Sequence, residues 1–127
     1  MRIATWNVNS VRTRAERIAA FLEREDVDVL AMQETKTADD KFPYATFEAA
    51  GYEVAHVGVS QWNGVAIASR VGLDNVRDSF TRQPAFAKKG DPSVEARAVG
   101  AVCGGVDVWS LYAVSYTHLT LPTNREV

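Results

Sequence analysis

The sequence predicts an α/β protein whose sheet is mixed and largely antiparallel, and three observations lead to this fold class. Apolar residues recur at helical spacing in one segment, and several other segments have the composition of strands. Two strand-like runs, residues 95–103 and 106–112, are joined only by Gly104-Gly105, which supplies the positive φ angles of a primed hairpin turn. The 127 residues are 46% hydrophobic and 24% charged, a balance that suits one small globular domain. A hairpin amid other strands favours a mixed or antiparallel sheet over a doubly wound parallel one.

The first half of the chain is predicted to form a strand, a helix and a second strand. Residues 2–7 are the first strand. Thr13 and Glu16 have the spacing of a capping box, in which each side chain satisfies a backbone amide at the start of a helix. Residues 27–33 are almost all apolar, as in a strand that is covered on both faces. The helix between the two strands places its apolar residues on one face: Ala15, Ile18, Ala19 and Leu22.

The second half begins with a short helix and continues as strands. Residues 42–51 carry Pro43 near the start and Gly51 at the exit, which is the usual asymmetry of a helix. Residues 71–89 are weakly patterned, and we expect a loop that contains one strand. The remaining predicted strands are residues 52–57 and 65–69, followed by the two runs of the hairpin.

Charge and hydropathy limit the class of protein. Fourteen basic and sixteen acidic residues give a net charge of −2, so the chain is not a bulk nucleic-acid coat, although an enzyme could still meet DNA through a local basic surface. No apolar run approaches the length of about eighteen residues that a transmembrane helix needs. The N-terminal stretch is too short and too polar for a signal-peptide core. We therefore expect a cytoplasmic protein without membrane association.

Four chemically versatile side chains are predicted to have structural roles. Cys103 is the single cysteine, so it cannot form an internal disulfide, and we expect it to act as a small buried hydrophobe. Trp6 and Trp109 are expected in the core. His56 falls in a strand pattern, which favours a structural role over a chemical one.

Two polar segments lie where predicted strands end. Asn7 closes the first strand and Glu34 closes the second. If the two strands are neighbours that end on the same side, a carboxylate and an amide oxygen meet there. Such hard oxygen donors suit Mg²⁺, which also keeps several waters and binds substrate phosphates. The alternative from the residues alone is that both are ordinary polar residues at a strand-to-loop boundary.

Several motifs in a fixed order resemble one known family. ATWNVNSVR is followed by VDVLAMQETK, FPYATFEAAGYEVAH, QWNGVAIASR, VEARAVGA and VDVWSLY. Together, from residue 1 to about residue 112, they resemble the exodeoxyribonuclease III group of the endonuclease/exonuclease/phosphatase superfamily. The resemblance implies a two-layered α/β sandwich, in which two mixed sheets lie face to face with helices outside. It also implies Mg²⁺-dependent cleavage of double-stranded DNA, with Mn²⁺ as a substitute, by 3′-to-5′ removal of nucleotides and by incision at abasic sites. No protein partner is evident.

The resemblance assigns three residues to catalysis. Glu34, in QETK, matches the metal-binding carboxylate of the family, and Asn7, in WNVN, matches the amide that supports the metal and the phosphate. Tyr112, in SLY, matches a tyrosine near the scissile phosphate, where its phenol would donate to a phosphate oxygen or orient the nucleophile. Attack on a phosphodiester gathers negative charge, so a cation and fixed donors aimed at that charge lower the barrier.

Other residues in these motifs are candidates for contact with DNA. A cationic side chain beside a phosphate fixes the register of a protein on DNA without reading its sequence. The alternatives are a solvated loop charge at Arg12 and Lys36, and a buried ion pair at Arg97. An Asn-Gly turn before a strand would explain Asn63 and its neighbour equally well. The candidates are Arg12, Lys36, Trp62, Asn63 and Arg97.

The chain departs from the family after Tyr112. The later Gly-Asp-x-Asn and Ser-Asp-His motifs are absent, and His118 follows Thr117 instead of an aspartate. The general base, its histidine partner and one metal-side carboxylate therefore have no counterpart. The stretch YTHLTLPTNREV, residues 116–127, also resembles translated adapter or vector sequence. We therefore expect the N-terminal part of the family domain over residues 1–114 and a non-native tail over residues 115–127. The alternative is a genuine lineage-specific C-terminus.

These departures shape the expected behaviour of the chain. The roughly 110 family-like residues would supply about one sheet and its helices, leaving the inner face of that sheet as an aggregation liability or a surface for a second chain. We expect a fragment of a DNA-repair nuclease that is inactive by itself. The alternatives are a phosphatase or phospholipase of the same superfamily, and a half-domain that binds nucleic acid or a partner without turnover.

Overall fold

A four-stranded mixed sheet forms the centre of the molecule. The computed structural model describes residues 1–83, 86–87 and 92–113. In this sheet β1 lies parallel to β2, and β4 lies antiparallel to both β2 and β3. The mixed sheet predicted from the sequence is therefore confirmed. Its strands, in spatial order, are β1 (Ile3–Asn7), β2 (Val29–Gln33), β4 (Val65–Ser69) and β3 (Glu53–Val57).

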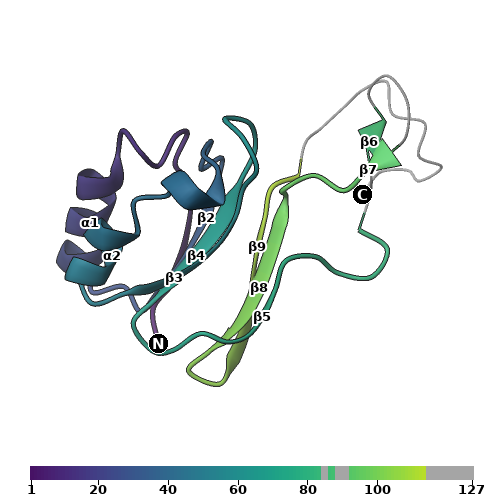
Figure 1. The fold of residues 1–127 in the computed structure, drawn as a ribbon. Coiled ribbons are helices and arrows are strands. Elements are labelled where there is room, and N and C mark those ends of the chain that lie inside the picture. The colour runs from purple at the N-terminus through teal and green to yellow at the C-terminus, as the bar shows by residue number, and fades with distance from the viewer. Residues whose placement is uncertain (84–85, 88–91, 114–127) are drawn as a thin grey trace.

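Helices cover one face of this sheet (Figure 1). They are α1 (Ala15–Arg24), the short 3₁₀ turn η1 (Asp39–Lys41) and α2 (Tyr44–Ala49). The apolar stripe of α1 buries Ile18 and Leu22, and α2 contributes Phe47 to the same core cluster. From the sheet, the alternate residues Leu30 and Met32 of β2 join that cluster. No helix in these described ranges is long and apolar enough to cross a membrane.

A three-stranded antiparallel sheet covers the other face, which we call the inner face. Its order is β5 (Asp74–Arg77), β8 (Ala98–Cys103) and β9 (Val106–Leu111). Val29 and Ile67 of the first sheet share a second core cluster with Val99 and Cys103 of the second. Since β2 contributes to both clusters, the prediction that residues 27–33 are covered on both faces is confirmed.

The hairpin between β8 and β9 has the predicted turn. Gly104 and Gly105 adopt φ angles of 55° and 84°, both in the left-handed region that a primed turn requires. Cys103 is fully buried beside this turn, as expected, and burial raises the pKa of its thiol. A further two-stranded antiparallel sheet, β6 (Phe86–Ala87) with β7 (Pro92–Ser93), lies away from the two larger sheets (Figure 1).

The prediction of an uncovered inner face is wrong. The β8–β9 hairpin folds back over the first sheet, because Val108 and Ser110 alternate with outward-facing residues and point into the sandwich. The uncovered surface lies elsewhere: Ile3 on the edge strand β1 is 46% exposed, and Leu111 on the edge strand β9 is 51% exposed.

Trp109 is also placed differently from the prediction. It alternates with the inward residues of β9, so it is part-buried on the outer face of the second sheet and lies outside both core clusters. There the Arg77 guanidinium lies 4.7 Å from its ring centroid, and the Phe80 ring meets it edge-on at 5.8 Å. Trp6, by contrast, packs against the helix-side core and meets Phe21 edge-on at 5.1 Å, as expected.

The start of α1 does not use the predicted capping box. The N-cap residue is Arg14, and it makes no side-chain cap hydrogen bond. The Thr13 hydroxyl instead donates to the Ser10 carbonyl oxygen at 3.3 Å, which ties the helix start to the loop after β1.

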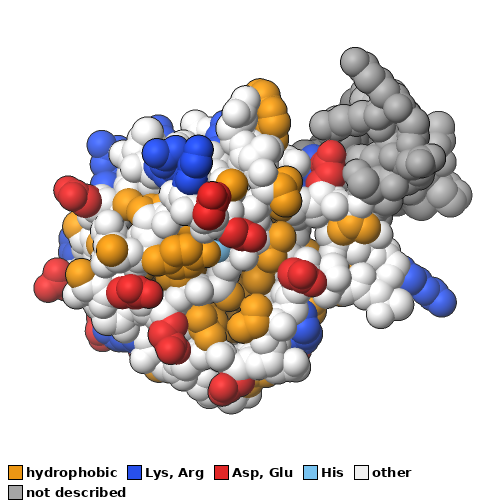
Figure 2. All heavy atoms as spheres, viewed as in Figure 1, with side chains coloured by type: hydrophobic (Ala, Val, Ile, Leu, Met, Phe, Trp, Pro, Cys, Tyr) orange, Lys and Arg blue, Asp and Glu red, His pale blue; other side chains and the backbone are white. Residues whose placement is uncertain are grey.

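The surface that Figure 2 shows carries acidic and basic side chains interspersed among apolar ones, in agreement with the small net charge.

Candidate active site

The ends of β1 and β2 bring the two predicted metal ligands to one edge of the sheet. The strands are parallel, and Asn7 pairs with Gln33 in their register. Beyond the strands, the Val8 amide donates to the Gln33 carbonyl at 2.9 Å and the Ser10 amide donates to the Glu34 carbonyl at 2.8 Å. The loop after β1 therefore runs beside the loop after β2, and Asn7 and Glu34 lie at the same end of neighbouring strands.

Five non-glycine residues around this edge have left-handed backbones. Each conformation of this kind costs on the order of 1 kcal/mol or more, and such residues cluster at functional sites. Hydrogen bonds between the loops hold them in place: the Thr35 amide donates to the Gly64 carbonyl at 3.1 Å, and the Lys36 amide donates to the Asn63 carbonyl at 2.9 Å. The five residues are Asn9, Ser10, Glu34, Lys36 and Asn63, with φ between 46° and 90°.

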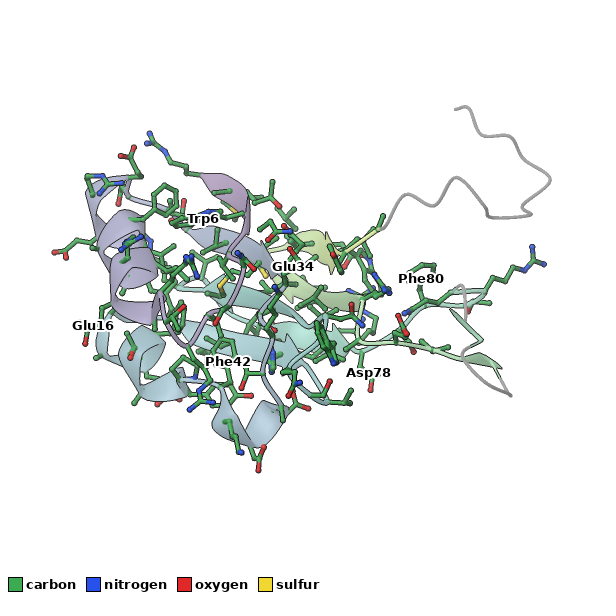
Figure 3. The ribbon with its side chains drawn as sticks, turned by 90° about the horizontal axis from the view of Figure 1, so that it is seen from above. Trp6, Glu16, Glu34, Phe42, Asp78 and Phe80 are labelled. Atoms are coloured by element: carbon green, nitrogen blue, oxygen red, sulfur yellow. The ribbon has the colours of Figure 1, made fainter. Side chains whose placement is uncertain are left out.

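Tyr112 meets Glu34 across the sandwich. Its phenol donates to Oε2 of Glu34 at 2.9 Å, although the two residues are 78 positions apart in the chain. Glu34 follows β2 of the first sheet and Tyr112 follows β9 of the second, so the contact joins the two sheets at this end. Figure 3 looks down on the molecule and places Glu34 near its middle, away from Glu16 on α1.

A second set of polar groups extends the site along the β1 side. The side-chain oxygen of Asn7 accepts from the Asn9 amide at 3.2 Å, which orients the Asn7 amide. The Lys36 ammonium donates to the side-chain oxygen of Asn9 at 2.6 Å. The structure thus joins Asn7, Asn9 and Lys36 in one chain of contacts, and it adds a positive charge to the loop that carries Glu34.

Arg97 forms an ion pair next to Tyr112. Its Nε and Nη2 atoms lie 2.8 and 2.7 Å from Oε1 of Glu95, and the two side chains are only 11% and 13% exposed. Asn63 donates to the same oxygen at 3.4 Å. Arg97 therefore forms the buried ion pair that the sequence analysis gave as the alternative to a contact with DNA. Glu95 was not predicted, because it lies before β8 beside a bend at residue 96, where its contact with Arg97 leaves no periodic signal in the sequence.

The other two candidates for DNA contact lie on the surface. Arg12 is exposed and lines a hollow beside α1 together with Glu16, Arg17 and Pro43. Trp62 is 64% exposed, and its amide donates to the Ser60 hydroxyl at 3.2 Å in the loop before β4. Neither position conflicts with a role on a DNA backbone, and neither requires one.

The His56 side chain contacts the loop that carries Glu34. Its ring is fully buried, with Nε2 2.8 Å from the Thr35 hydroxyl and Nδ1 2.7 Å from a carboxylate oxygen of Asp39. The Phe42 ring lies 4.5 Å away. Burial lowers the pKa of His56, and the Asp39 carboxylate offsets this in part. These contacts fit the structural role predicted for His56, and they identify Thr35, which the sequence reading missed, as its partner beside Glu34.

The donors at the site fit a hard cation in kind but are few in number. Glu34 offers a carboxylate and Asn7 an amide oxygen, which are ligands that Mg²⁺ accepts. No group of three or more His, Cys, Asp or Glu side chains that could hold a metal occurs within residues 1–83, 86–87 and 92–113. A cation here would therefore depend on water, on phosphate oxygens and on ligands from outside this set.

Comparison with known proteins identifies the family. The sequence pattern of the endonuclease/exonuclease/phosphatase family matches residues 4–111. The chain belongs to this family. It is similar to exodeoxyribonuclease III of Haemophilus influenzae, with 34% identity over 89 residues, covering 70% of this chain and 33% of that protein.

Solved structures of family members share the fold. An AP endonuclease from Archaeoglobus fulgidus is 40% identical, with a TM-score of 0.72 over 88% of this chain and 41% of its own. A Neisseria 3′ phosphatase, NExo, solved with a product DNA hairpin, is 34% identical, with a TM-score of 0.77 over 88% of this chain and 41% of its own. The two-layered arrangement expected from the resemblance is thereby confirmed, and the chain spans between a third and a half of the length of these relatives.

Proposed function

We propose that this chain is part of a Mg²⁺-dependent DNA-repair nuclease of the exodeoxyribonuclease III type, which cleaves phosphodiester bonds at abasic sites and at 3′ ends of double-stranded DNA. The observation that carries the proposal is the hydrogen bond from Tyr112 to Glu34, which joins residues of two family-like motifs across the sandwich. Relatives named as exodeoxyribonuclease III and AP endonuclease support the reaction, and the NExo structure with a DNA hairpin supports the substrate.

The site residues divide the chemistry of phosphodiester cleavage among them. Glu34 and Asn7 would hold the cation, whose charge stabilises the negative phosphoryl oxygens when it is bound. The Tyr112 phenol donates a hydrogen bond to Glu34, and it can donate to a phosphate oxygen instead when substrate binds. Lys36, anchored on Asn9, adds a positive charge that attracts the DNA backbone.

The site residues named above do not form a complete catalytic site. Cleavage also needs a base that activates water, and groups that act as a unit lose most of their activity when one is missing. His56 is fully buried and held between Thr35 and Asp39, so it does not reach a substrate. We therefore propose that the 127-residue chain does not incise an abasic-site duplex, whereas the complete product of its parent gene does.

The decisive experiment compares the two proteins on one substrate panel. The complete parent protein and the 127-residue chain are incubated in Mg²⁺ with an abasic-site duplex, a duplex with a recessed 3′ end, inositol phosphates and sphingomyelin. We expect only the complete protein to cleave, on the two DNA substrates, and to lose this activity in Glu34→Gln. Activity on the lipid or inositol substrates alone would instead assign the parent to the phosphatases or phospholipases of the superfamily.

A binding module without turnover is the second candidate. It is favoured by the small number of metal ligands, because no group of three or more His, Cys, Asp or Glu side chains that could hold a metal occurs among the described residues. Such a module would bind duplex DNA with an affinity that falls steeply as salt rises, because phosphate contacts release counterions. Salt-sensitive binding by the complete parent, with no cleavage in Mg²⁺ or Mn²⁺, would support this candidate and overturn the nuclease.

A further inference from the structure

We propose that Glu95 and Arg97 form a positioning unit that fixes the phenol of Tyr112 against Glu34. This inference rests on the proposed function, because it gives a purpose to the Tyr112–Glu34 contact. It assigns no contact with DNA to either residue. Both would act through the tyrosine, by setting the position and the angle of its ring.

The hairpin places Arg97 directly beside Tyr112. Ala98 pairs with Leu111 at the open end of the β8–β9 ladder, so Arg97 and Tyr112 are the next residues outward on the two strands. The Tyr112 amide donates to the Arg97 carbonyl at 2.9 Å, which continues the ladder by one bond. The Arg97 guanidinium then lies 5.0 Å from the centroid of the Tyr112 ring, within the range of a cation–π contact.

Glu95 holds the guanidinium in that place. Two guanidinium nitrogens of Arg97 lie within 2.8 Å of one Glu95 oxygen, and both side chains are nearly buried. A buried ion pair stabilises a fold little, because desolvation of the charges offsets their attraction. It does fix geometry, since the planar guanidinium is held at more than one nitrogen. The pair therefore suits the positioning of a ring better than it suits general stabilisation.

A closed ring of contacts links this pair back to Glu34. Asn63 donates to the Glu95 carboxylate at 3.4 Å, and the Gly64 amide donates to the Ala96 carbonyl at 2.9 Å. The same Asn63-Gly64 turn accepts the amides of the two residues that follow Glu34. The distance between Glu34 and Tyr112 is thus fixed from both sides. A ring of this kind preorganises the two side chains before any substrate binds.

The test observes the phenol directly and needs no nuclease activity. The 127-residue chain is labelled with ¹³C at the Cζ atom of tyrosine, and the Tyr112 signal is assigned with Tyr112→Phe. In the wild-type chain, Glu34→Gln is expected to shift this signal, because it replaces a charged acceptor by a neutral one. In Arg97→Lys and in Glu95→Gln, we expect the response to Glu34→Gln to fall below about a third of its wild-type size, as coupling through a shared network requires.

A matched control lies on the outer face of the second sheet. Arg77 pairs with the Asp107 carboxylate and stacks over the Trp109 ring at 4.7 Å, so it repeats the arginine–carboxylate–aromatic arrangement away from the site. Arg77→Lys should leave the Tyr112 response unchanged. Glu95→Gln keeps the shape of its side chain, so it provides a folded variant if the arginine substitution unfolds the chain.

The outcomes separate the inference from the proposed function. A folded Arg97→Lys or Glu95→Gln chain whose Tyr112 signal still responds fully to Glu34→Gln would overturn the positioning role. Loss of the response in the control Arg77→Lys as well would also overturn it, because the effect would then be global. Loss of the response only in the Glu95 and Arg97 variants supports it, whether or not the complete parent protein proves to be a nuclease.

Discussion

Glu34 and Asn7 are the residues that the sequence located best, because their positions follow from the ends of two strands. Polar residues after apolar runs are visible in the sequence, and the parallel pairing of β1 with β2 brings them to one edge. Thr35 and Glu95 escaped the sequence reading for a physical reason. Their roles depend on contacts with His56 and Arg97, which come from loop geometry and side-chain burial. Such contacts leave no periodic signal in the sequence.

The first prediction at this scale concerns metal affinity. One carboxylate and one amide leave most positions around Mg²⁺ to water. We expect the 127-residue chain to bind Mg²⁺ with a dissociation constant in the millimolar range or weaker, about 4 kcal/mol of binding free energy. Calorimetric titration of the chain and of Glu34→Gln measures it. A micromolar affinity that Glu34→Gln abolishes would contradict the prediction.

The second residue-scale prediction concerns His56 and pH. Burial lowers its pKa in the folded chain below the ordinary value of about 6.5, so the unfolded chain binds the proton more readily. Above about pH 6.5, the free energy of unfolding should therefore keep its full value. On acidification it should fall by up to about 1.4 kcal/mol per pH unit, until the pKa of His56 in the folded chain is reached.

Urea unfolding between pH 5 and pH 8 checks the effect of His56, at roughly the range in which histidine titrates. His56→Gln keeps a polar partner for the Thr35 hydroxyl but removes the titrating ring. The difference in pH dependence between the two chains isolates His56, since every other titrating group is shared. Parallel curves for wild type and His56→Gln would show that His56 does not couple to stability.

At the scale of elements, the apolar patterns predicted most strands and the first helix within a few residues, and Pro43 with Gly51 predicted the second helix. The turn at Gly104-Gly105 was predictable because a two-residue hairpin loop requires positive φ angles, which glycine adopts without steric cost. The capping box failed because its spacing, Thr13 to Glu16, is a local pattern. In the folded chain the Thr13 hydroxyl bonds to the Ser10 carbonyl, and the helix begins at Ala15.

The third prediction concerns the turn that supports the site. Gly64 has a φ of +93°, and a Cβ atom there would lie 2.1 Å from the Thr35 hydroxyl oxygen. Gly51 has a φ of +92° but has open space around the same position. Gly51→Ala should therefore cost only the backbone strain, about 1 kcal/mol. Gly64→Ala should cost at least about 3 kcal/mol, because the clash displaces Thr35 as well.

The two alanine variants are compared by urea denaturation, with the Tyr112 ¹³C signal as a second measurement. Gly64→Ala should also shift that signal, because its turn belongs to the ring of contacts around Glu34. Gly51→Ala, at the exit of α2, should not. Equal losses of stability in the two variants would show that the Gly64 turn is not specially constrained.

At the scale of the whole molecule, the sequence motifs predicted the sandwich but not how completely this chain builds it. The prediction of one sheet with an uncovered inner face failed because it counted strands and ignored where the β8–β9 hairpin would fold. That hairpin packs Val99 and Cys103 on Val29 and Ile67, so the two layers already share a core. The predicted boundary at residue 114 and the predicted tail, residues 115–127, lie outside the described residues.

An open groove remains along the β1 and β9 side of the sandwich. It measures about 390 Å³, and its lining includes Ile3, Thr5, Gln33, Val108 and Leu111. Gln33 spans it by donating to the Thr5 hydroxyl at 3.0 Å and the Ser110 hydroxyl at 3.1 Å. Both β1 and β9 are edge strands within the described residues. Exposed edges beside apolar side chains are templates for pairing with another chain.

The fourth prediction is that the 127-residue chain associates with itself through this groove. Leu111 is 51% exposed at its rim, and Leu111→Lys places a charge where a second strand would pair. We expect sedimentation velocity to show an average mass that rises with concentration for the wild-type chain and much less for Leu111→Lys. Val59 is 78% exposed and does not line the groove, so Val59→Lys adds the same charge as a control. Because both variants change the net charge equally, a difference between them must come from the groove. A wild-type chain that stays monomeric at every concentration, or an equal effect of the two substitutions, would exclude the groove as the site of association.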